Sequence, residues 1–110
     1  MEKKSVDKYE CPVTYCMSKI GGKWKPIILF LIQKGANRFG ILHRGINCIS
    51  KQMLTKQLKE LVADGFLNRK IFAEIPPRVE YSITDLGHSL FPIIESMRDW
   101  GEKNMIGMEE

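Results

Sequence analysis

Two adjacent prolines interrupt the most strand-like part of the sequence. Pro76 and Pro77 stand between an apolar and basic run, residues 67–73, and a strict alternation of apolar and polar residues over 79–83. Alternation of this kind predicts a half-buried β-strand. Because proline has no N–H group to donate, a strand ladder cannot continue through the pair. The stretch therefore predicts a β-hairpin whose tip lies at the prolines and carries an exposed arginine, Arg78.

The segment before the hairpin predicts an amphipathic helix. Ser50 is a favoured N-cap residue, and Gly65 ends the helical pattern. At the spacing of one helix face lie Met53, Leu54, Leu58, Leu61 and Val62. On the other face lie Lys51, Gln52, Thr55, Lys56 and Lys59. The first face is expected to pack inward and the second to meet solvent.

Three shorter segments come earlier. Pro12 suits the first position of a helix that Gly21 and Gly22 stop. Residues 25–33 open with a proline and are apolar on all sides, which favours a central buried helix, with a buried strand as the alternative. Residues 39–46 have the spacing of a short helix, so that residues 46–49 form a turn before Ser50.

The C-terminal part predicts one long helix with a narrow apolar seam. Thr84 can cap it, and Pro92 lies inside it and is expected to kink it, because proline removes a helical hydrogen bond. The seam residues are spaced four, three, four and three apart, as in a coiled coil, and are Leu86, Leu90, Ile93, Met97 and Trp100.

Length and composition limit the chain to one domain. With 110 residues, 44% of them hydrophobic, it can bury one core but not two. We expect a domain over residues 11–104, with a flexible arm at 1–10 and a flexible tail at 105–110. The longest apolar run, 26–32, is too short for a membrane span. Three cysteines without a C-x-x-C pair favour a reducing compartment, so we expect a cytoplasmic protein without a membrane partner.

The charges are unevenly distributed. The net charge is only +4, yet no Asp or Glu occurs between Cys11 and Lys59, where nine lysines and arginines lie. Such a stretch is typical either of a solvated basic face or of a surface that binds a polyanion. Charge alone does not separate nucleic acid from an anionic membrane.

The order of elements predicts an α+β, mainly helical fold, a winged helix-turn-helix with a two-stranded wing. In this layout the helix after Ser50 enters the major groove of double-stranded DNA, and its outward residues near the N-terminus read base edges. These predicted base-reading residues are Lys51, Gln52, Thr55 and Lys56, and the capping residue Ser50 is also expected to contact DNA. Lys59, Arg38 and Arg44 are expected to bind phosphates, and Arg78 to reach a neighbouring minor groove.

Several motifs resemble those of the HxlR family of bacterial and archaeal transcription regulators. They are "CPV" at 11–13, "IGGKW" at 20–24, "RFGIL" at 38–42, "ISKQMLTKQLKELVADGFLNRK" at 49–70, "PPRVEYSITDLG" at 76–87 and "WG" at 100–101. The resemblance covers nearly the whole domain. It departs at Lys51, where the family usually has proline after the capping serine, so sequence preference within the family does not carry over.

The resemblance implies a homodimer that binds operator DNA and is built from the N- and C-terminal helices. Val13 and Met17 then join the predicted seam as dimer-interface residues. The family also places a cysteine at the position of Cys11, which in some members senses oxidants or electrophiles. A thiol beside a helix N-terminus has its thiolate stabilised, although Glu10 opposes this and a purely structural Cys11 remains the alternative. The inducer, a small molecule or an electrophile, is not identified by the sequence.

Other classes of site are poorly supported. Cys11, Cys16, His43 and Cys48 lack the paired spacing of zinc ligands, so no metal or other cofactor is expected. The carboxylates are not paired on an apolar face and Ser50 has no positioned His or Asp, so we expect no enzyme activity. The alternative function is a winged-helix protein-interaction module that binds no DNA.

Overall fold

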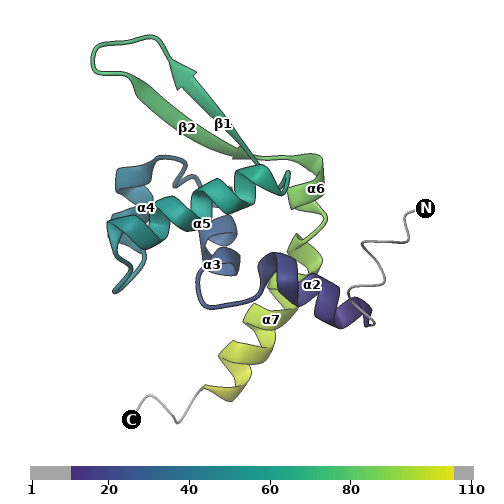
Figure 1. Ribbon diagram of the computed structural model, residues 1–110. Helices are drawn as coiled ribbons and strands as arrows, with labels where there is room; N and C mark the ends of the chain where they lie inside the picture. Colours follow the sequence, from purple (N-terminus) through teal and green to yellow (C-terminus); the bar gives the residue numbers. More distant parts are fainter. Residues whose placement is uncertain (1–10, 106–110) are drawn as a thin grey trace, which may run out of the picture.

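The computed structural model describes residues 11–105, and the predicted N-terminal arm and most of the predicted tail lie outside them. The elements in chain order are α2 (Pro12–Ile20), α3 (Lys25–Gln33), α4 (Phe39–Gly45), α5 (Lys51–Ala63), β1 (Leu67–Phe72), β2 (Arg78–Ile83), α6 (Asp85–His88) and α7 (Phe91–Asn104). Figure 1 shows the hairpin rising on one side of the helical body and α7 projecting on the opposite side. The predicted winged helix-turn-helix class is confirmed.

Residues 25–33 form a helix, so the alternative of a buried strand is wrong. Pro26 lies in its first turn, where a missing N–H costs no hydrogen bond. The helix is apolar on all sides, as the sequence shows, but it is buried on only part of its circumference. Ile28 and Leu29 are inaccessible to solvent, whereas Ile27 is 40% exposed. A helix in so small a domain has neighbours on only part of its circumference.

The hydrophobic core takes one face from each of several helices and the start of the wing. α5 contributes Leu54, Leu58 and Leu61, all nearly inaccessible to solvent. Burying each leucine stabilises the fold by roughly 1.5–3 kcal/mol relative to leaving it exposed. The other members of this cluster are Ile20, Ile28, Leu29, Ile32, Leu42, Ile46, Ile49, Phe66, Leu67, Leu90, Phe91 and Ile94.

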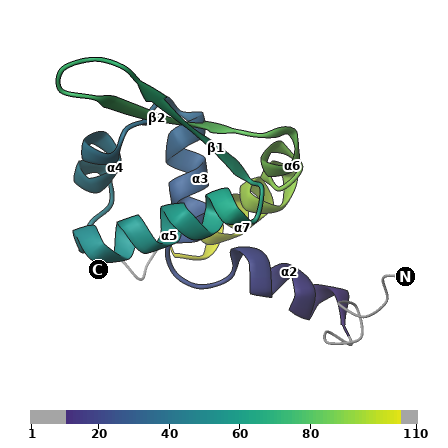
Figure 2. The ribbon, with the colours of Figure 1, turned by 45° about the horizontal axis from the view of Figure 1, so that its top comes forward.

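The wing is a two-stranded antiparallel sheet whose register runs from the pair Leu67 and Ile83 to the pair Phe72 and Arg78. Residues 73–77 form its tip. The N–H of Tyr81 donates a hydrogen bond of 2.9 Å to the carbonyl oxygen of Asn37, which ties β2 to the segment before α4. Figure 2 shows the wing lying over the layer formed by α3, α4 and α5.

The single long C-terminal helix that the sequence predicted is instead two helices. α6 ends at His88, and α7 begins at Phe91. The hydroxyl of Thr84 accepts from the N–H of Gly87 at 2.9 Å, as a capping residue does, and donates to the carbonyl of Gly65 at 2.6 Å. Pro92 lies in the first turn of α7, where it starts a helix and does not kink one.

An ion pair fixes α3 against α5. The Lys25 ammonium lies 2.6 Å from a carboxylate oxygen of Glu60, and Lys25 as a residue is only 8% exposed. This hydrogen bond holds the pKa of Glu60 below its ordinary value. Lys25 is therefore a structural cation, although the sequence placed it in the basic stretch. Lys19 likewise approaches Asp64 at 3.8 Å. No helix among residues 11–105 is long and apolar enough to cross a membrane.

Gly87 lies where α6 meets the chain before β1. A Cβ atom added there would overlap the carbonyl oxygen of Phe66 and lie 2.7 Å from Cγ2 of Ile83. The nearest obstacle is backbone, which cannot rotate away as a side chain can. Only glycine fits this junction.

We therefore expect Gly87→Ala to lower the free energy of unfolding by about 1–3 kcal/mol through overpacking. Urea denaturation at fixed protein concentration measures this loss of stability. We expect a lower urea concentration at the midpoint of unfolding and an unchanged dependence of the unfolding free energy on urea. Gly40→Ala is the matched control, because its Cβ would meet only the flexible end of Arg44, at 3.4 Å. Equal midpoints for Gly87→Ala and the unmodified protein would contradict the close contact.

Candidate nucleic-acid interface

The outward face of α5 carries the residues that the sequence predicted. Lys51, Gln52, Thr55, Lys56 and Lys59 are all exposed. The helix begins as expected, because the Ser50 hydroxyl accepts from the N–H of Met53 at 3.0 Å. The Thr55 hydroxyl is already engaged, since it donates to the carbonyl of Lys51 at 2.9 Å.

A tight turn joins α4 to α5. Ile46 and Ile49 are buried and anchor its two ends, while Cys48 is exposed and has a φ of 69°. A left-handed backbone is uncommon for a residue other than glycine and costs some stability. The two buried isoleucines hold this turn in place, and the turn fixes the angle between α4 and α5.

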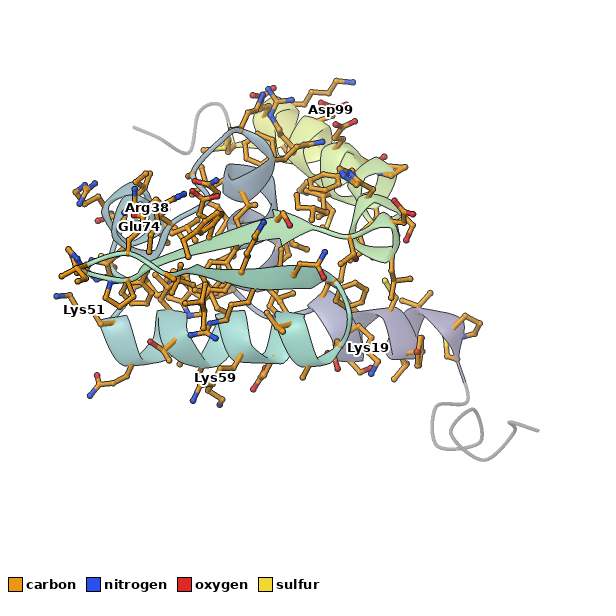
Figure 3. The ribbon with its side chains drawn as sticks, turned by 90° about the horizontal axis from the view of Figure 1, so that it is seen from above. Lys19, Arg38, Lys51, Lys59, Glu74 and Asp99 are labelled. Carbon is orange, nitrogen blue, oxygen red and sulfur yellow. The ribbon has the colours of Figure 1, made fainter. Side chains whose placement is uncertain are left out.

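Arg38 and Arg44 lie on α4, next to α5. Arg38 is the N-cap residue of α4, Arg44 is in its last turn, and both are exposed. Figure 3 shows Arg38 beside Glu74 of the wing tip, at the same end of the molecule as Lys51. The pKa of Glu74 is lowered mainly by its hydrogen bonds with Arg78, and the charge of Arg38 contributes further.

Arg78 differs from the prediction of an exposed arginine at the hairpin tip. It is the first residue of β2, its side chain is only 27% exposed, and its guanidinium stacks 3.7 Å from the ring centre of Phe72. It donates to Glu74 at 2.8 Å and also to Glu80. These bonds raise the pKa of Arg78. The carboxylates of Glu74, in the tip, and Glu80, in β2, bind this side chain. The alternation of apolar and polar residues in the sequence gave no sign of these pairs.

Arg69 on β1 is a further cation of this region that the sequence did not predict as a site residue. Arg69 and Lys59 line the same cavity of about 400 Å³ between α5 and the wing. The other lining residues are Phe39, Thr55, Leu58, Val62, Ala63 and Tyr81. The signal in the sequence was the basic pair Arg69-Lys70 within a strand. Its position beside α5 follows only from the hairpin folding back along the helix.

Cys11 is exposed at the N-terminus of α2, where it is the N-cap residue. Its thiol forms no capping hydrogen bond within the usual distance and angle limits. The backbone amides of Thr14 and Val13 nevertheless hold the pKa of Cys11 below its ordinary value. Within residues 11–105, no three His, Cys, Asp or Glu side chains gather as metal ligands would.

Most of the predicted dimer-interface residues are exposed, and one is not. Leu90 is 9% exposed and belongs to the core of the protomer, because it lies in the break between α6 and α7. The exposed members are Val13, Met17, Leu86, Ile93, Met97 and Trp100. Trp100, at 69% exposed, contributes a large apolar surface to α7.

A cationic helix that follows a tight turn and is flanked by a two-stranded wing defines the winged helix-turn-helix class of transcription regulators. The sequence profile of the HxlR-like helix-turn-helix family matches residues 19–109. The chain belongs to this family, and the protein is a transcription regulator with a helix-turn-helix domain.

Individual relatives agree with this assignment. The chain is 44% identical over 105 residues to the HTH-type transcriptional regulator YybR of Bacillus subtilis. The aligned region covers 94% of this chain and 84% of that protein. The structure is similar to the redox regulator HypR in its oxidized form, with a TM-score of 0.82 and 45% identity over 86% of this chain and 97% of that chain. For the reduced form the TM-score is 0.83, with 42% identity over 90% and 98% of the two chains.

The lowered pKa of Cys11 gives a direct test. We expect iodoacetamide to alkylate Cys11 with a pH midpoint below the value of about 8.5 for a free cysteine, because the thiolate is the reactive form. Mass spectrometry of the Cys11 peptide across a pH series measures the midpoint. The protein unfolded in guanidinium chloride is the control, since unfolding removes the helix amides. Identical midpoints in both states would rule out their influence.

Proposed function

We propose that this protein is a homodimeric, sequence-specific DNA-binding regulator that acts on operator DNA. The observation that carries the proposal is the outward face of α5, which presents three lysines, a glutamine and a threonine. Glu60, the one acid in Lys51–Ala63, is paired with Lys25 in the direction of α3. DNA therefore meets a face with cations and amide groups but no unpaired acid.

The side chains on this face suit the chemistry of the major groove. Lysine donates to the acceptors of guanine, and an amide such as that of Gln52 pairs bidentately with adenine. Lys59 lies two turns from the start of α5 and shares a cavity with Arg69, so both are assigned to the phosphate backbone. Arg38 and Arg44 on α4 extend the same basic surface.

The exposed apolar residues of α2 and α7 support a homodimer. Contiguous exposed apolar side chains typically mark a contact with another protein, and Ile93, Met97 and Trp100 of α7 line one surface hollow. A symmetric dimer would cover them in both protomers at once and would present two copies of α5 to two DNA half-sites.

Cys11 supports a redox or electrophile response. It is exposed and its thiolate is stabilised, which favours reaction with oxidants. The similarity to HypR, a redox regulator solved in oxidized and reduced forms, points the same way. We assign Cys11 as the responsive group, so that diamide treatment changes operator affinity in the unmodified protein but not in Cys11→Ser.

The DNA-binding proposal is tested by fluorescence anisotropy with DNA that flanks the protein's gene and with scrambled DNA, over a range of salt concentrations. We expect Lys59→Gln to weaken binding to both DNAs and to make the salt dependence shallower by about 0.9 in log–log slope for the lost phosphate contact. Gln52→Ala is expected to leave the slope unchanged and to reduce discrimination between the two DNAs by roughly 5- to 100-fold.

Lys103→Gln, which removes a lysine from the last turn of α7, is the control and should alter neither property. Equal and weak binding of the unmodified protein to both DNAs would favour a partner other than this DNA. An unchanged slope for Lys59→Gln would remove Lys59 from the phosphate contacts.

The dimer proposal is tested with Ile93→Asp, which places a charge on the exposed apolar surface of α7. We expect sedimentation velocity to give a dimer for the unmodified protein at micromolar concentration and a monomer for this variant, because the carboxylate would be desolvated in the interface. Ile71→Asp replaces an isoleucine of similar exposure on β1 and should remain dimeric. A dimeric Ile93→Asp would place the interface elsewhere.

A further inference from the structure

The cavity between α5 and the wing has an apolar floor. Its volume is about 400 Å³, and its lining includes Leu58 and Val62 of α5, Phe39 of α4 and Tyr81 of β2. Leu58 is only 2% exposed and belongs to the core. Small-molecule sites in proteins begin at about 300 Å³ and are mostly apolar, with a few placed polar groups. The cavity is therefore large enough for a small organic molecule, and its floor suits the apolar part of one.

Two cations line this cavity and no acid does. They are Lys59 of α5 and Arg69 of β1, and both are exposed. Neither forms an ion pair with any residue in the described part of the chain. Glu60, the acid next to Lys59 in the sequence, is paired with Lys25. The cavity thus combines apolar surface with positive charge that no carboxylate of residues 11–105 neutralises, and this combination is complementary to an amphipathic anion.

The fold holds these groups in fixed positions. Arg69 and Tyr81 are directly opposite in the antiparallel register, so their side chains stand on the same face of the wing. Lys59 and Val62 lie three residues apart on α5 and share a helix face. The N–H of Tyr81 donates to the carbonyl of Asn37 at 2.9 Å, which holds β2 in place. Figures 2 and 3 show the wing running alongside α5. The cavity is therefore formed before any ligand binds.

A phosphate of DNA accounts for only part of this arrangement. A phosphate that meets Lys59 and Arg69 has no apolar group to cover Leu58 and Phe39. A molecule with an aromatic ring and a carboxylate satisfies both parts of the cavity. The ring packs on the floor, and the carboxylate accepts hydrogen bonds from the two cations.

We propose that this cavity binds a small aromatic carboxylate, which pairs with Lys59 and Arg69 and thereby weakens DNA binding. Its effect on DNA rests on the proposed DNA-binding function, in which both cations contact phosphates. A carboxylate that occupies them removes two phosphate contacts. Because the two binding equilibria are linked, DNA weakens binding of the carboxylate by the same factor.

The site itself is tested without DNA, by titrating the protein with 2-naphthoate and following amide shifts in ¹H–¹⁵N NMR spectra. We expect saturable shifts at Leu58, Lys59 and Arg69, with a dissociation constant of roughly 0.1–1 mM for a ligand of this size. The matched ligands are 2-naphthalenemethanol, which has the rings but no charge, and acetate, which has the charge but no ring. Each should bind about 10-fold more weakly or less. Binding of either one as tight as that of 2-naphthoate, or shifts confined to other surfaces, would overturn the proposal.

Two variants separate the charge of the cavity from its space. Arg69→Gln should weaken 2-naphthoate binding about 5- to 20-fold and leave 2-naphthalenemethanol unaffected, because only the carboxylate loses a partner. Ala63, the last residue of α5, also lines the cavity. Ala63→Phe should abolish binding of 2-naphthoate, because the new ring fills the space while both cations remain.

Lys70→Gln is the control for these variants. Lys70 follows Arg69 on β1, so its side chain lies on the opposite face of the strand, and it does not line the cavity. It should keep full affinity for 2-naphthoate. Equal losses in Lys70→Gln and Arg69→Gln would reveal non-specific attraction and exclude the site. Unchanged affinity in Ala63→Phe would place the probe outside the cavity and overturn the proposal.

Fluorescence anisotropy tests the effect on DNA. Saturating 2-naphthoate should weaken binding to flanking and scrambled DNA alike and make the salt dependence shallower by about 1.8 in log–log slope, for two lost phosphate contacts. Sodium acetate at the same concentration matches the ionic strength and should change neither property further. Unchanged DNA affinity with 2-naphthoate bound would overturn the regulatory role. Absence of any DNA binding by the unmodified protein would instead overturn the proposed function, and the NMR titration would still decide whether the site exists.

Discussion

The rest of the structure depends on the burial of one face of α5. Leu54, Leu58 and Leu61 are packed in the core, and successive helix residues differ by about 100° in direction. A rotation by a single residue would bring a lysine into apolar surroundings, which is costly. The ion pair of Glu60 with Lys25 consolidates this orientation and turns the one acid of the helix away from its basic face. The same contacts that stabilise the domain therefore decide which charges α5 exposes to solvent.

In the wing, by contrast with α5, the cation is held by neighbouring groups and an apolar side chain is exposed. Its arginine at the base of the tip is turned to neighbouring carboxylates and an aromatic ring, while Ile75 is fully exposed. The basic helix supplies charge and hydrogen-bond donors, and the wing tip supplies shape and apolar surface. The two elements thus present different chemistry to solvent.

Local chemistry could be predicted from the sequence with good accuracy. The Ser50 and Thr84 caps, the ends of α2 and α3, the outward face of α5 and the position of the hairpin tip at Pro76 and Pro77 all depend on residues close together in the chain. The break before α7 could not be predicted in this way. The seam from Leu86 to Trp100 has unbroken helical spacing, but Leu90 is drawn into the core and Pro92 starts a new helix.

The sequence by itself determined the class of fold, the amphipathic helix with its basic outward face and the family, because apolar periodicity, capping residues and short motifs are properties of neighbouring positions. Only the tertiary structure decided which cations are free. Lys25 pairs with a glutamate 35 positions later, Arg78 is held by carboxylates and a ring across the hairpin, and Arg69 comes to lie beside α5. Each outcome depends on distances between segments that folding brings together, and these distances cannot be inferred from the order of residues along the chain.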